Sequence, residues 1–356
     1  WDTFTSALDL TNRKALEYVC QVVRTAAVAW NFPYLKLDFL YAAAVRCQYQ
    51  DGTKTRAQVL RMGLEKIKSE LGGTEILLGC GLPLGSAIGL FPVMRIGADV
   101  LGSWYPQYFG LRSIFRSEPY MPAARNSIQN ILSRSFYHRK WWINDPDCLL
   151  VRPNSGLTLA EVQSLATAIG LTGGSIFISD DLAQLPVERI HLAASLLPPL
   201  DQRPWLLDWF DNPTPCKLRL DLKNSSGTWQ VLAFFNWADS PRAVSLSPQD
   251  FKLPPENYWV RSFWTNELRQ VPKGQPLFSG SLPAHGALLI AVRRTAAISS
   301  PRYLGSNLHI SQGVEARQWQ AEDYQLNFTI DLGRDCEGMV DLYLPRPASS
   351  ITSNSK

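Results

Sequence analysis

The sequence predicts an α/β fold in residues 1–210 and an antiparallel all-β domain in residues 211–356. Up to about residue 200, short apolar segments alternate with amphipathic segments at helical spacing, an order typical of a parallel sheet with helices outside it. After Pro198-Pro199, short β-like segments follow one another between Pro, Gly, Ser and Asn, as in an antiparallel sandwich. These segments cover 229–235, 243–246, 258–264, 287–292, 308–310, 326–332 and 339–344.

Four helices are predicted in the first domain from apolar residues at helical spacing and from capping signals. Thr11 is expected to cap the first helix, which runs to about Trp30. The capping box Thr158-Leu159-Ala160-Glu161 opens the fourth. The other two are expected over about 55–71 and 123–136.

Five short apolar segments predict strands at about 34–38, 75–80, 93–96, 141–143 and 175–179. Acidic residues follow these segments: Asp38, Asp99, Asp145, Asp147 and Asp180. Charged residues at the carboxyl ends of successive parallel strands form the active sites of (β/α)₈ barrels. Five strands cannot close an eight-stranded barrel. We therefore predict the C-terminal portion of a (β/α)₈ TIM barrel in residues 1–210, with the first three strands upstream of Trp1, followed by an antiparallel β-sandwich.

Composition and charge exclude several classes of function. The net charge is +4 without a basic run, which argues against nucleic-acid partners. The six cysteines lie far apart, so we expect reduced thiols rather than a zinc site or disulfides. No apolar run approaches the roughly 20 residues of a membrane span, and no signal peptide opens the chain. We expect a cytoplasmic protein without membrane partners, on the understanding that any targeting signal would lie upstream.

The segment 34–38 looks like a buried strand, yet it carries two full charges. Side chains alternate between the faces of a strand, so Lys36 and Asp38 point the same way. Burying both is costly unless they are paired or needed for function. One interpretation is a structural ion pair, and the other is an ionised carboxylate kept beside a cation at the mouth of an α/β barrel.

Four motifs at the strand ends occur in a fixed order: Lys36-Leu37-Asp38, Cys80-Gly81-Leu82-Pro83, Arg95-Ile96-Gly97-Ala98-Asp99 and Asn144-Asp145-Pro146-Asp147-Cys148. In these motifs the chain resembles the clan D glycoside hydrolases, above all the family 36 α-galactosidases and more distantly family 27. Each motif is weak alone, whereas the ordered set is specific. The resemblance covers residues 1–200, and Tyr303-Leu304-Gly305-Ser306 and His309-Ile310-Ser311-Gln312-Gly313 extend it into the β region.

The resemblance implies a retaining glycosidase that needs no cofactor and no metal. Asp38 would be the nucleophile and Asp99 the acid/base, with the two carboxyls ~5–5.5 Å apart. Lys36 is expected to favour the ionised carboxylate of Asp38, whereas Asp99 must hold a proton in the resting enzyme. The resemblance also assigns Lys36 and Arg95 to sugar hydroxyls, and Asp147 and Cys80 to the pocket wall.

The sequence departs from the family pattern in two places. The first three barrel strands, which contribute a tryptophan and acidic residues to the sugar site, are not in this chain. Family 27 places a Glu after the cysteine that matches Cys80, and this chain has Gly81. A small residue there leaves an α-N-acetylgalactosaminide open as the substrate.

Several nearby residues are expected to be structural. Asp145 is expected to cap its loop beside Pro146. Asp180 and Asp181 are expected to cap the helix that begins near Pro186, or to shape the loop that leads to it. His138 is expected at the surface without a role.

Four functions therefore stay open. The first is hydrolysis of terminal α-galactosides from oligosaccharides, and the second is transfer of the galactosyl unit to a sugar acceptor, as in raffinose synthases. The third is a Mg²⁺ enzyme of the barrel type, although Lys36 and Arg95 would repel the ion. The fourth is a truncated chain without activity, acting as a binding module. Association into a homo-oligomer is left open.

Overall fold

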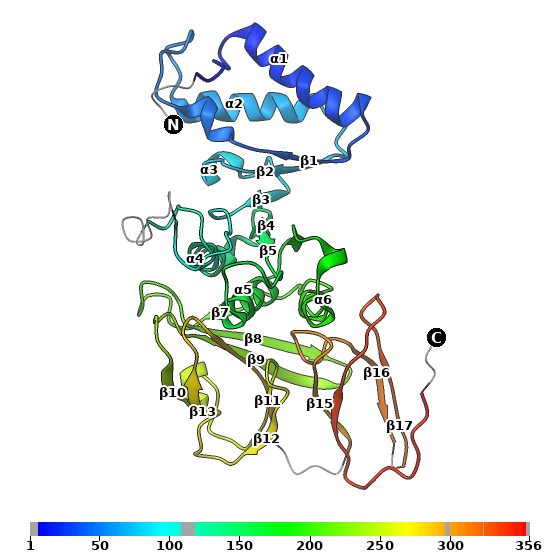
Figure 1. Cartoon of the computed structure of the whole chain (residues 1–356). Coiled ribbons are helices and arrows are strands. Elements are labelled where there is room, and N and C mark those ends of the chain that lie inside the picture. Colours follow the sequence, from blue (N-terminus) through cyan, green and yellow to red (C-terminus); the bar gives the residue numbers. More distant parts are fainter. Residues whose placement is uncertain (1–5, 108–117, 296–299, 323, 354–356) are drawn as a thin grey trace. The chain divides into compact units, whose positions relative to one another are not determined.

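The computed structural model describes residues 6–107, 118–295, 300–322 and 324–353, and the chain divides into two compact units (Figure 1). Unit 1 comprises Trp1–Gly97 and Phe136–Pro146. Unit 2 comprises Ala98–Ser135 and Asp147–Lys356. A barrel domain over residues 1–210 and a β domain over 211–356 stay predictions.

Unit 1 contains three α-helices, a π-helical turn (Thr25–Ala29), a 3-10 helix (Leu40–Ala44) and one sheet of four strands in the described residues. The α-helices are α1 (Arg13–Arg24), α2 (Arg56–Ser69) and α3 (Leu84–Ala87), and the strands are β1 (Tyr34–Leu37), β2 (Ile76–Gly79), β3 (Val93–Arg95) and β4 (Ile143–Asp145). Neighbouring strands pair in parallel in the order β1-β2-β3-β4. The predicted parallel sheet is therefore confirmed for these four strands.

The helices α1 and α2 begin at side-chain caps and pack on the sheet. Asn12, rather than the predicted Thr11, caps α1, since its side chain accepts from the backbone N–H groups of Lys14 and Ala15. Thr55 and Gln58 form a capping box at the start of α2. One core cluster joins α1 and α2 to the inward-facing leucines of β1, and a second joins α2 to β2, β3 and the segment after α3.

The strand β1 is an edge strand, which corrects the prediction that it is buried. Among the described residues it pairs with β2 alone. Leu35 and Leu37 are half-buried against the helices, whereas Lys36 and Asp38 are exposed. In this part of the chain Lys36 and Asp38 form no ion pair with each other, which removes the interpretation of a structural ion pair.

The fifth predicted strand belongs to unit 2. It is the two-residue strand β6 (Phe177–Ile178), which pairs in parallel with β5 (Cys148–Leu149). Within the described residues the four strands of unit 1 form an open sheet. The mixed α/β architecture is thus observed, and a closed eight-stranded barrel stays a prediction.

Unit 2 combines helices with antiparallel sheets. Its helices are α4 (Ala124–Arg134), α5 (Leu159–Thr172) and α6 (Val187–Ala194). Its remaining strands are β7 (Trp205–Leu206), β8 (Lys217–Asn224), β9 (Gly227–Phe235), β10 (Arg242–Leu246), β11 (Tyr258–Ser262), β12 (Leu268–Val271), β13 (Phe278–Leu282), β14 (Ala287–Arg294), β15 (Arg302–Ser306), β16 (Ala316–Ala321), β17 (Leu326–Ile330) and β18 (Val340–Tyr343). None of the helices in the described ranges is long and apolar enough to cross a membrane.

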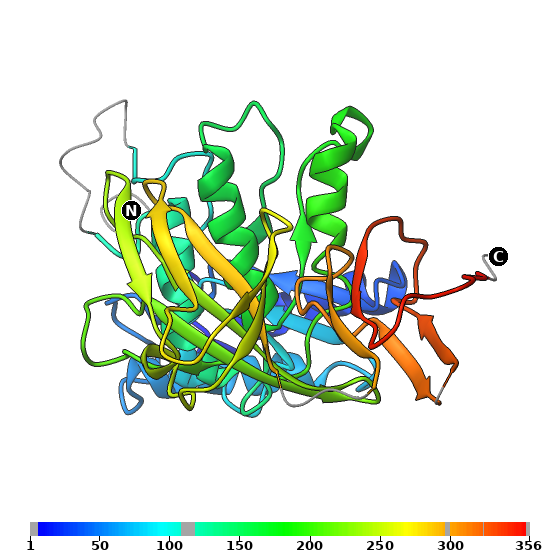
Figure 2. The same cartoon turned by 90° about the horizontal axis from the view of Figure 1, so that it is seen from below.

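A six-stranded antiparallel sheet with the order β12-β11-β14-β9-β8-β7 organises unit 2. The strand β9 alternates between its two faces: Val231 and Ala233 join the core cluster that includes α4, α5 and α6, whereas Leu232 and Phe234 join the cluster that includes β10 and β13. The helices therefore cover one face of the sheet, and the β10-β13 pair covers the other (Figures 1 and 2). This second layer agrees with the predicted antiparallel sandwich.

The last part of the chain forms two further antiparallel pairs, β15 with β18 and β16 with β17. The predicted strand at 308–310 is wrong, because these residues form a turn. There the ring of His309 accepts a hydrogen bond from the backbone N–H of Ser311 at 3.1 Å. Ile310 is fully buried, and its backbone N–H donates to the carbonyl of Ser195 at 2.8 Å.

Candidate active site

The carboxyl ends of the parallel strands in unit 1 gather four of the predicted site residues at one edge of the sheet. Lys36 lies on β1 and Asp38 directly after it, Cys80 directly follows β2, and Arg95 ends β3. The neighbouring strands pair in register up to these ends. This is the edge at which parallel α/β sheets carry their ligand sites.

A backbone donor orients the exposed carboxylate of Asp38. Its Oδ1 accepts from the backbone N–H of Phe39 at 2.7 Å. Phe39 has a left-handed backbone with φ 54°, a conformation that costs a non-glycine residue about 1 kcal/mol or more. A backbone hydrogen bond from Tyr41 to the carbonyl of Gly81, at 2.6 Å, holds the chain just beyond this turn. The direction of the Asp38 side chain is therefore fixed where the chain leaves β1.

Cys80 is a buried, protonated thiol rather than a nucleophile. Burial, together with the neighbouring Asp38 side chain, raises the pKa of the Cys80 thiol to about 12. The positive charges of Arg95 and Lys36 act in the opposite direction on the same thiol, so both cations lie within electrostatic range of it. The thiol stays protonated at neutral pH.

Gly81 owes its identity to the backbone. Its φ is +55°, which disfavours every residue with a Cβ. A Cβ built on Gly81 would lie 3.1 Å from the backbone nitrogen of Phe39 and 3.4 Å from Oδ1 of Asp38. Backbone and carboxylate atoms already fill this space, so the missing side chain opens no room for a larger sugar substituent.

Arg95 is held by a buried carboxylate on the neighbouring strand. Its Nη1 lies 3.8 Å from Oδ2 of Asp145, and both side chains are almost fully buried, with 3% and 2% of their surfaces exposed. The backbone also joins the two strands here, because Ile96 donates to the carbonyl of Asp145 at 3.0 Å. The structural role predicted for Asp145 therefore includes this ion pair, which holds Arg95 in place.

Asp99 and Asp147 both belong to unit 2, where a hydrogen bond joins their segments. Asp99 is exposed, and Asp147 is half-buried. Oδ2 of Asp147 accepts from the backbone N–H of Val100, the residue after Asp99, at 2.7 Å. Asp147 has a left-handed backbone with φ 77°. The structure thus gives Asp147 a contact to the loop that carries Asp99, which is a different task from the predicted wall of a pocket.

The N-terminus of α4 holds the same loop. No side chain caps this helix at Ala123. Its first backbone N–H groups bond instead to loop carbonyls: Ala123 to Asp99 at 3.1 Å, Ala124 to Ser103 at 3.0 Å and Arg125 to Trp104 at 3.1 Å. The first backbone N–H groups of a helix have no partner within the helix. In α4 these groups bond to the loop of Asp99 and fix it.

The expectation for His138 is wrong, and so is the helix cap expected for Asp180. His138 is buried rather than at the surface, because its Nδ1 accepts from the backbone N–H of Asn144 at 3.2 Å. Asp180 caps no helix: its carboxylate accepts from the backbone N–H groups of Val151 and Arg152 and from the Arg152 guanidinium, at 2.6–2.9 Å. Asp181 does shape the loop before α6, since it accepts from Ala183 at 3.1 Å.

The structure therefore brings together Lys36, Asp38, Cys80 and Arg95 in unit 1, and Asp99 with Asp147 in unit 2. Among the described residues, no group of three or more His, Cys, Asp or Glu side chains is arranged to hold a metal ion. The catalytic and binding roles assigned to the six residues stay predictions.

No protein-family model matches the chain. Among solved structures, an α-galactosidase from Thermus thermophilus in complex with stachyose is 28% identical over 54% of this chain, with a TM-score of 0.46. The chain spans about 40% of the length of that enzyme.

Two further solved structures share the fold over more of the chain. α-Galactosidase I from Mortierella vinacea has a TM-score of 0.53 and 17% identity, and the match covers 76% of this chain and 70% of the other. A family 27 β-L-arabinopyranosidase variant from Geobacillus stearothermophilus, in complex with arabinose, has a TM-score of 0.57 and 14% identity over 83% of this chain and 68% of its own. These likenesses establish a common fold for three quarters or more of the chain.

Proposed function

We propose that this chain carries catalytic residues of a retaining glycoside hydrolase that cleaves terminal α-galactosides. The observation that carries the proposal is the convergence of Lys36, Asp38, Cys80 and Arg95 at the carboxyl edge of a parallel sheet. It is supported by the fold, which the chain shares with an α-galactosidase and a β-L-arabinopyranosidase. Family 36 is the family whose motifs these residues resemble.

In the proposed mechanism Asp38 is the nucleophile. One carboxylate oxygen attacks the anomeric carbon, and the bond from that carbon to the leaving oxygen breaks, which gives a glycosyl ester on Asp38. The hydrogen bond from the backbone N–H of Phe39 supports this role, because it orients the carboxylate before substrate arrives.

Asp99 is the proposed acid/base. Its carboxyl proton passes to the leaving oxygen in the first step, and the resulting carboxylate takes a proton from water in the second. The water oxygen then attacks the anomeric carbon, the ester bond to Asp38 breaks, and the sugar leaves with the configuration that it had in the substrate. The hydrogen bonds that hold the Asp99 loop support this role.

Lys36 and Arg95 are proposed to bind hydroxyl groups of the sugar. Both are cations with several N–H donors and no acceptor, which suits oxygen atoms of a sugar ring. The ion pair with Asp145 limits the rotamers of Arg95, so its donors are positioned in advance.

The geometry of Gly81 favours an unsubstituted galactoside over the N-acetyl sugar. An N-acetyl substituent would need the space that a missing side chain at Gly81 leaves. That side chain would point at Phe39 and Asp38 rather than into open space. We therefore place α-galactosides first and α-N-acetylgalactosaminides second.

The test is hydrolysis of a chromogenic α-galactoside by the chain and by its Asp38→Ala variant, with the α-N-acetylgalactosaminide and the α-glucoside as competing substrates. We expect turnover of the α-galactoside, and its loss in the variant. Because Asp38→Ala leaves room for a small anion, added azide should restore product as the β-galactosyl azide. That product has the inverted configuration which marks the lost residue as the nucleophile.

Two outcomes would contradict the proposal. One is turnover that Asp38→Ala leaves unchanged, and the other is a cooperatively folded chain that turns over none of the three sugars. Asp221→Ala, which changes an exposed carboxylate on β8, is the matched control and should keep full activity. Product analysis with added raffinose or sucrose separates hydrolysis from galactosyl transfer, because both reactions share the glycosyl ester.

A further inference from the structure

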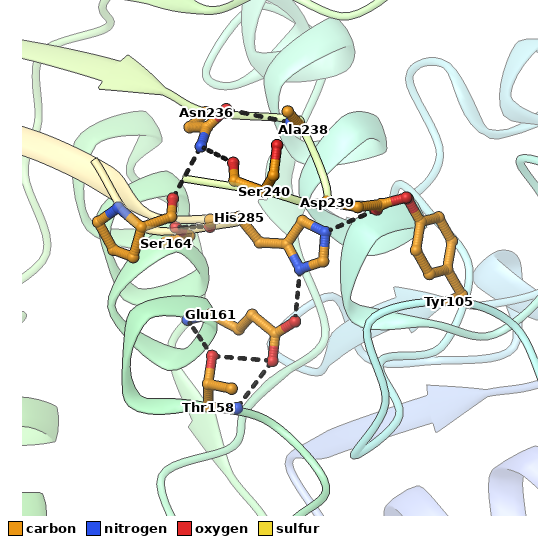
Figure 3. A network of polar contacts seen from close by, with 10 residues as sticks. Tyr105, Thr158, Glu161, Ser164, Asn236, Ala238, Asp239, Ser240 and His285 are labelled. Atoms are coloured by element: carbon orange, nitrogen blue, oxygen red, sulfur yellow. Dashed lines mark hydrogen bonds and ion pairs between the residues drawn. The ribbon is translucent and has the colours of Figure 1, made fainter. Parts of the chain in front are cut away.

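His285 of unit 2 lies between two carboxylates (Figure 3). Its Nδ1 is 2.7 Å from Oε1 of Glu161, and its Nε2 is 3.0 Å from Oδ1 of Asp239. Glu161 belongs to the first turn of α5, Asp239 to the loop between β9 and β10, and His285 to the turn between β13 and β14. Both ring nitrogens can donate at once only when the imidazole is protonated.

Two aromatic residues of the Asp99 loop pack against this histidine. The ring of Trp104 stacks on the imidazole, with centroids 4.2 Å apart and planes 11° apart. Tyr105 meets the imidazole edge-on at 5.9 Å, and its hydroxyl donates to Oδ1 of Asp239 (Figure 3). The guanidinium of Arg125 lies 5.8 Å from the centroid of the Tyr105 ring. A protonated imidazole attracts the face of Trp104 more strongly than a neutral one does.

The loop that reaches His285 is the one that carries Asp99. Asp147 binds it at Val100, the start of α4 binds it at Ser103 and Trp104, and His285 contacts it at Trp104 and Tyr105. Of these three attachments, only the one at His285 involves a group that changes charge near neutral pH.

We propose that protonated His285 is a positioning residue for Asp99. Glu161 and Asp239 hold the imidazole in place. The imidazole in turn fixes Trp104 and Tyr105, and with them the loop that leads back to Asp99. Loss of the proton removes the imidazole hydrogen bond to one of the two carboxylates and weakens the stacking on Trp104. The loop then gains freedom, and turnover falls. The last step rests on the proposed function of Asp99, whereas the coupling of His285 to the loop does not.

The surroundings of His285 set the pH at which the imidazole loses its proton. Burial lowers the pKa of His285, but the hydrogen bonds to Glu161 and Asp239 outweigh burial and leave the pKa above its ordinary value. Burial raises the pKa of Glu161, yet its bonds to His285 and Thr158 leave it lowered, so Glu161 stays ionised throughout. The contribution of His285 is thus complete below about pH 6.5 and is lost as the pH rises through its raised pKa.

The test combines proton NMR with hydrogen exchange on the full chain. The chain has four histidines, so the variant His285→Asn identifies the resonance of His285 by its loss. Asn is chosen because position 285 has φ 59°, which Asn tolerates, and because its backbone carbonyl can still accept from Ser164. Exchange of the backbone amides in residues 100–105 is then compared at about pH 6 and about pH 9, as protection factors corrected for intrinsic rates.

We expect His285 to titrate above about pH 6.5, and its pKa to fall in Asp239→Asn. We expect protection of residues 100–105 to drop about tenfold in His285→Asn at low pH, the equivalent of about 1.4 kcal/mol. The wild-type chain should show the same drop on its own as the pH rises. The control is His191→Gln, which changes the exposed histidine of α6 and should alter neither the titration nor the protection.

Protection of residues 100–105 that is independent of both pH and His285→Asn would overturn the inference. If His285→Asn fails to fold, the pH dependence of protection in the wild-type chain decides whether His285 and the loop are coupled. With an α-galactoside as substrate, His285→Asn should lower kcat and remove the alkaline decline of kcat that follows the pKa of His285, while KM changes little. If His285 and the loop are coupled but neither the wild-type chain nor any variant turns over the α-galactoside, only the proposed function is contradicted. If the chain turns over the α-galactoside but His285 and the loop are not coupled, only the role of His285 is contradicted.

Discussion

Asp147 accepts a hydrogen bond from the backbone N–H of Val100 at 2.7 Å, so a carboxylate after β4 holds the residue that follows Asp99. The bond spans 47 positions of the sequence. Asp147 makes this bond from a left-handed backbone, with φ 77°.

The variant Asp147→Ala should therefore be less stable than Asp147→Asn. Asn keeps an acceptor for Val100 and tolerates a left-handed backbone, whereas Ala loses the acceptor and keeps the strain. We expect a difference of about 1–3 kcal/mol in the free energy of unfolding, measured in urea. Equal stability of the two variants would show that the bond to Val100 contributes nothing.

Cys80 should resist thiol reagents in the folded chain. Its pKa of about 12 leaves almost no thiolate at about pH 8, and its side chain is buried. Cys47 and Cys336 are exposed and serve as internal controls. Iodoacetamide followed by peptide mass spectrometry should label these two and leave Cys80 unlabelled until denaturant is added. Early labelling of Cys80 would contradict the assignment of a buried, protonated thiol.

Gly81→Ala should destabilise the chain by about 1–3 kcal/mol, because the added Cβ meets the backbone of Phe39 and the φ of +55° is strained. The control is Gly85→Ala in α3, where a Cβ meets no atom within 4 Å. Ala favours a helix, so that variant should be neutral or more stable by up to about 1 kcal/mol. Thermal unfolding of both variants decides the comparison, and a stable Gly81→Ala would reopen the case for an N-acetyl sugar.

Arg95 and Asp145 should show strong coupling in a double-mutant cycle. Removal of either partner leaves a buried charge and should cost about 3–5 kcal/mol. The double variant Arg95→Leu with Asp145→Leu should cost clearly less than the sum of the two single variants. Additive costs in urea unfolding would mean that the two groups act independently.

The acid limb of stability should depend on Glu161. Its pKa is lowered in the folded chain, because its bonds to His285 and Thr158 outweigh burial. Its contribution is present above the ordinary value of about 4.3 and is lost as the pH falls through the lowered value. Glu161→Gln should flatten the decline in unfolding free energy below about pH 5. Glu188→Gln, at an exposed position in the first turn of α6, should leave the decline intact.

The sequence predicted best where the signal is local. Apolar spacing located α2, and a capping box with apolar spacing located α5, to within about two residues, because caps and core contacts of a helix lie within a few positions of each other. The strand β8 was missed although Leu218, Leu220 and Leu222 alternate as a half-buried strand requires.

Other features depend on partners far away in the chain. The exposure of β1 depends on which strands pair beside it. The start of α4 has no side-chain cap that the sequence could reveal, because carbonyls of the Asp99 loop take the place of a cap. Glu161 and His285 meet across 124 positions, so the sequence revealed only the local capping role of Glu161. The candidate residues of unit 1 were predictable because the ends of neighbouring parallel strands meet wherever the strands pair in order.

The two oxygens of Glu161 serve different parts of unit 2. Oε2 accepts from Thr158 at the start of α5, and Oε1 bonds to His285 in the turn between β13 and β14. Fraying of the first turn of the helix breaks the bond to that hairpin, and movement of the hairpin takes one partner from the carboxylate that caps the helix. The helical layer and the β layer of unit 2 should consequently open as a single cooperative unit, with α5 and the β13–β14 turn exchanging their amide protons together.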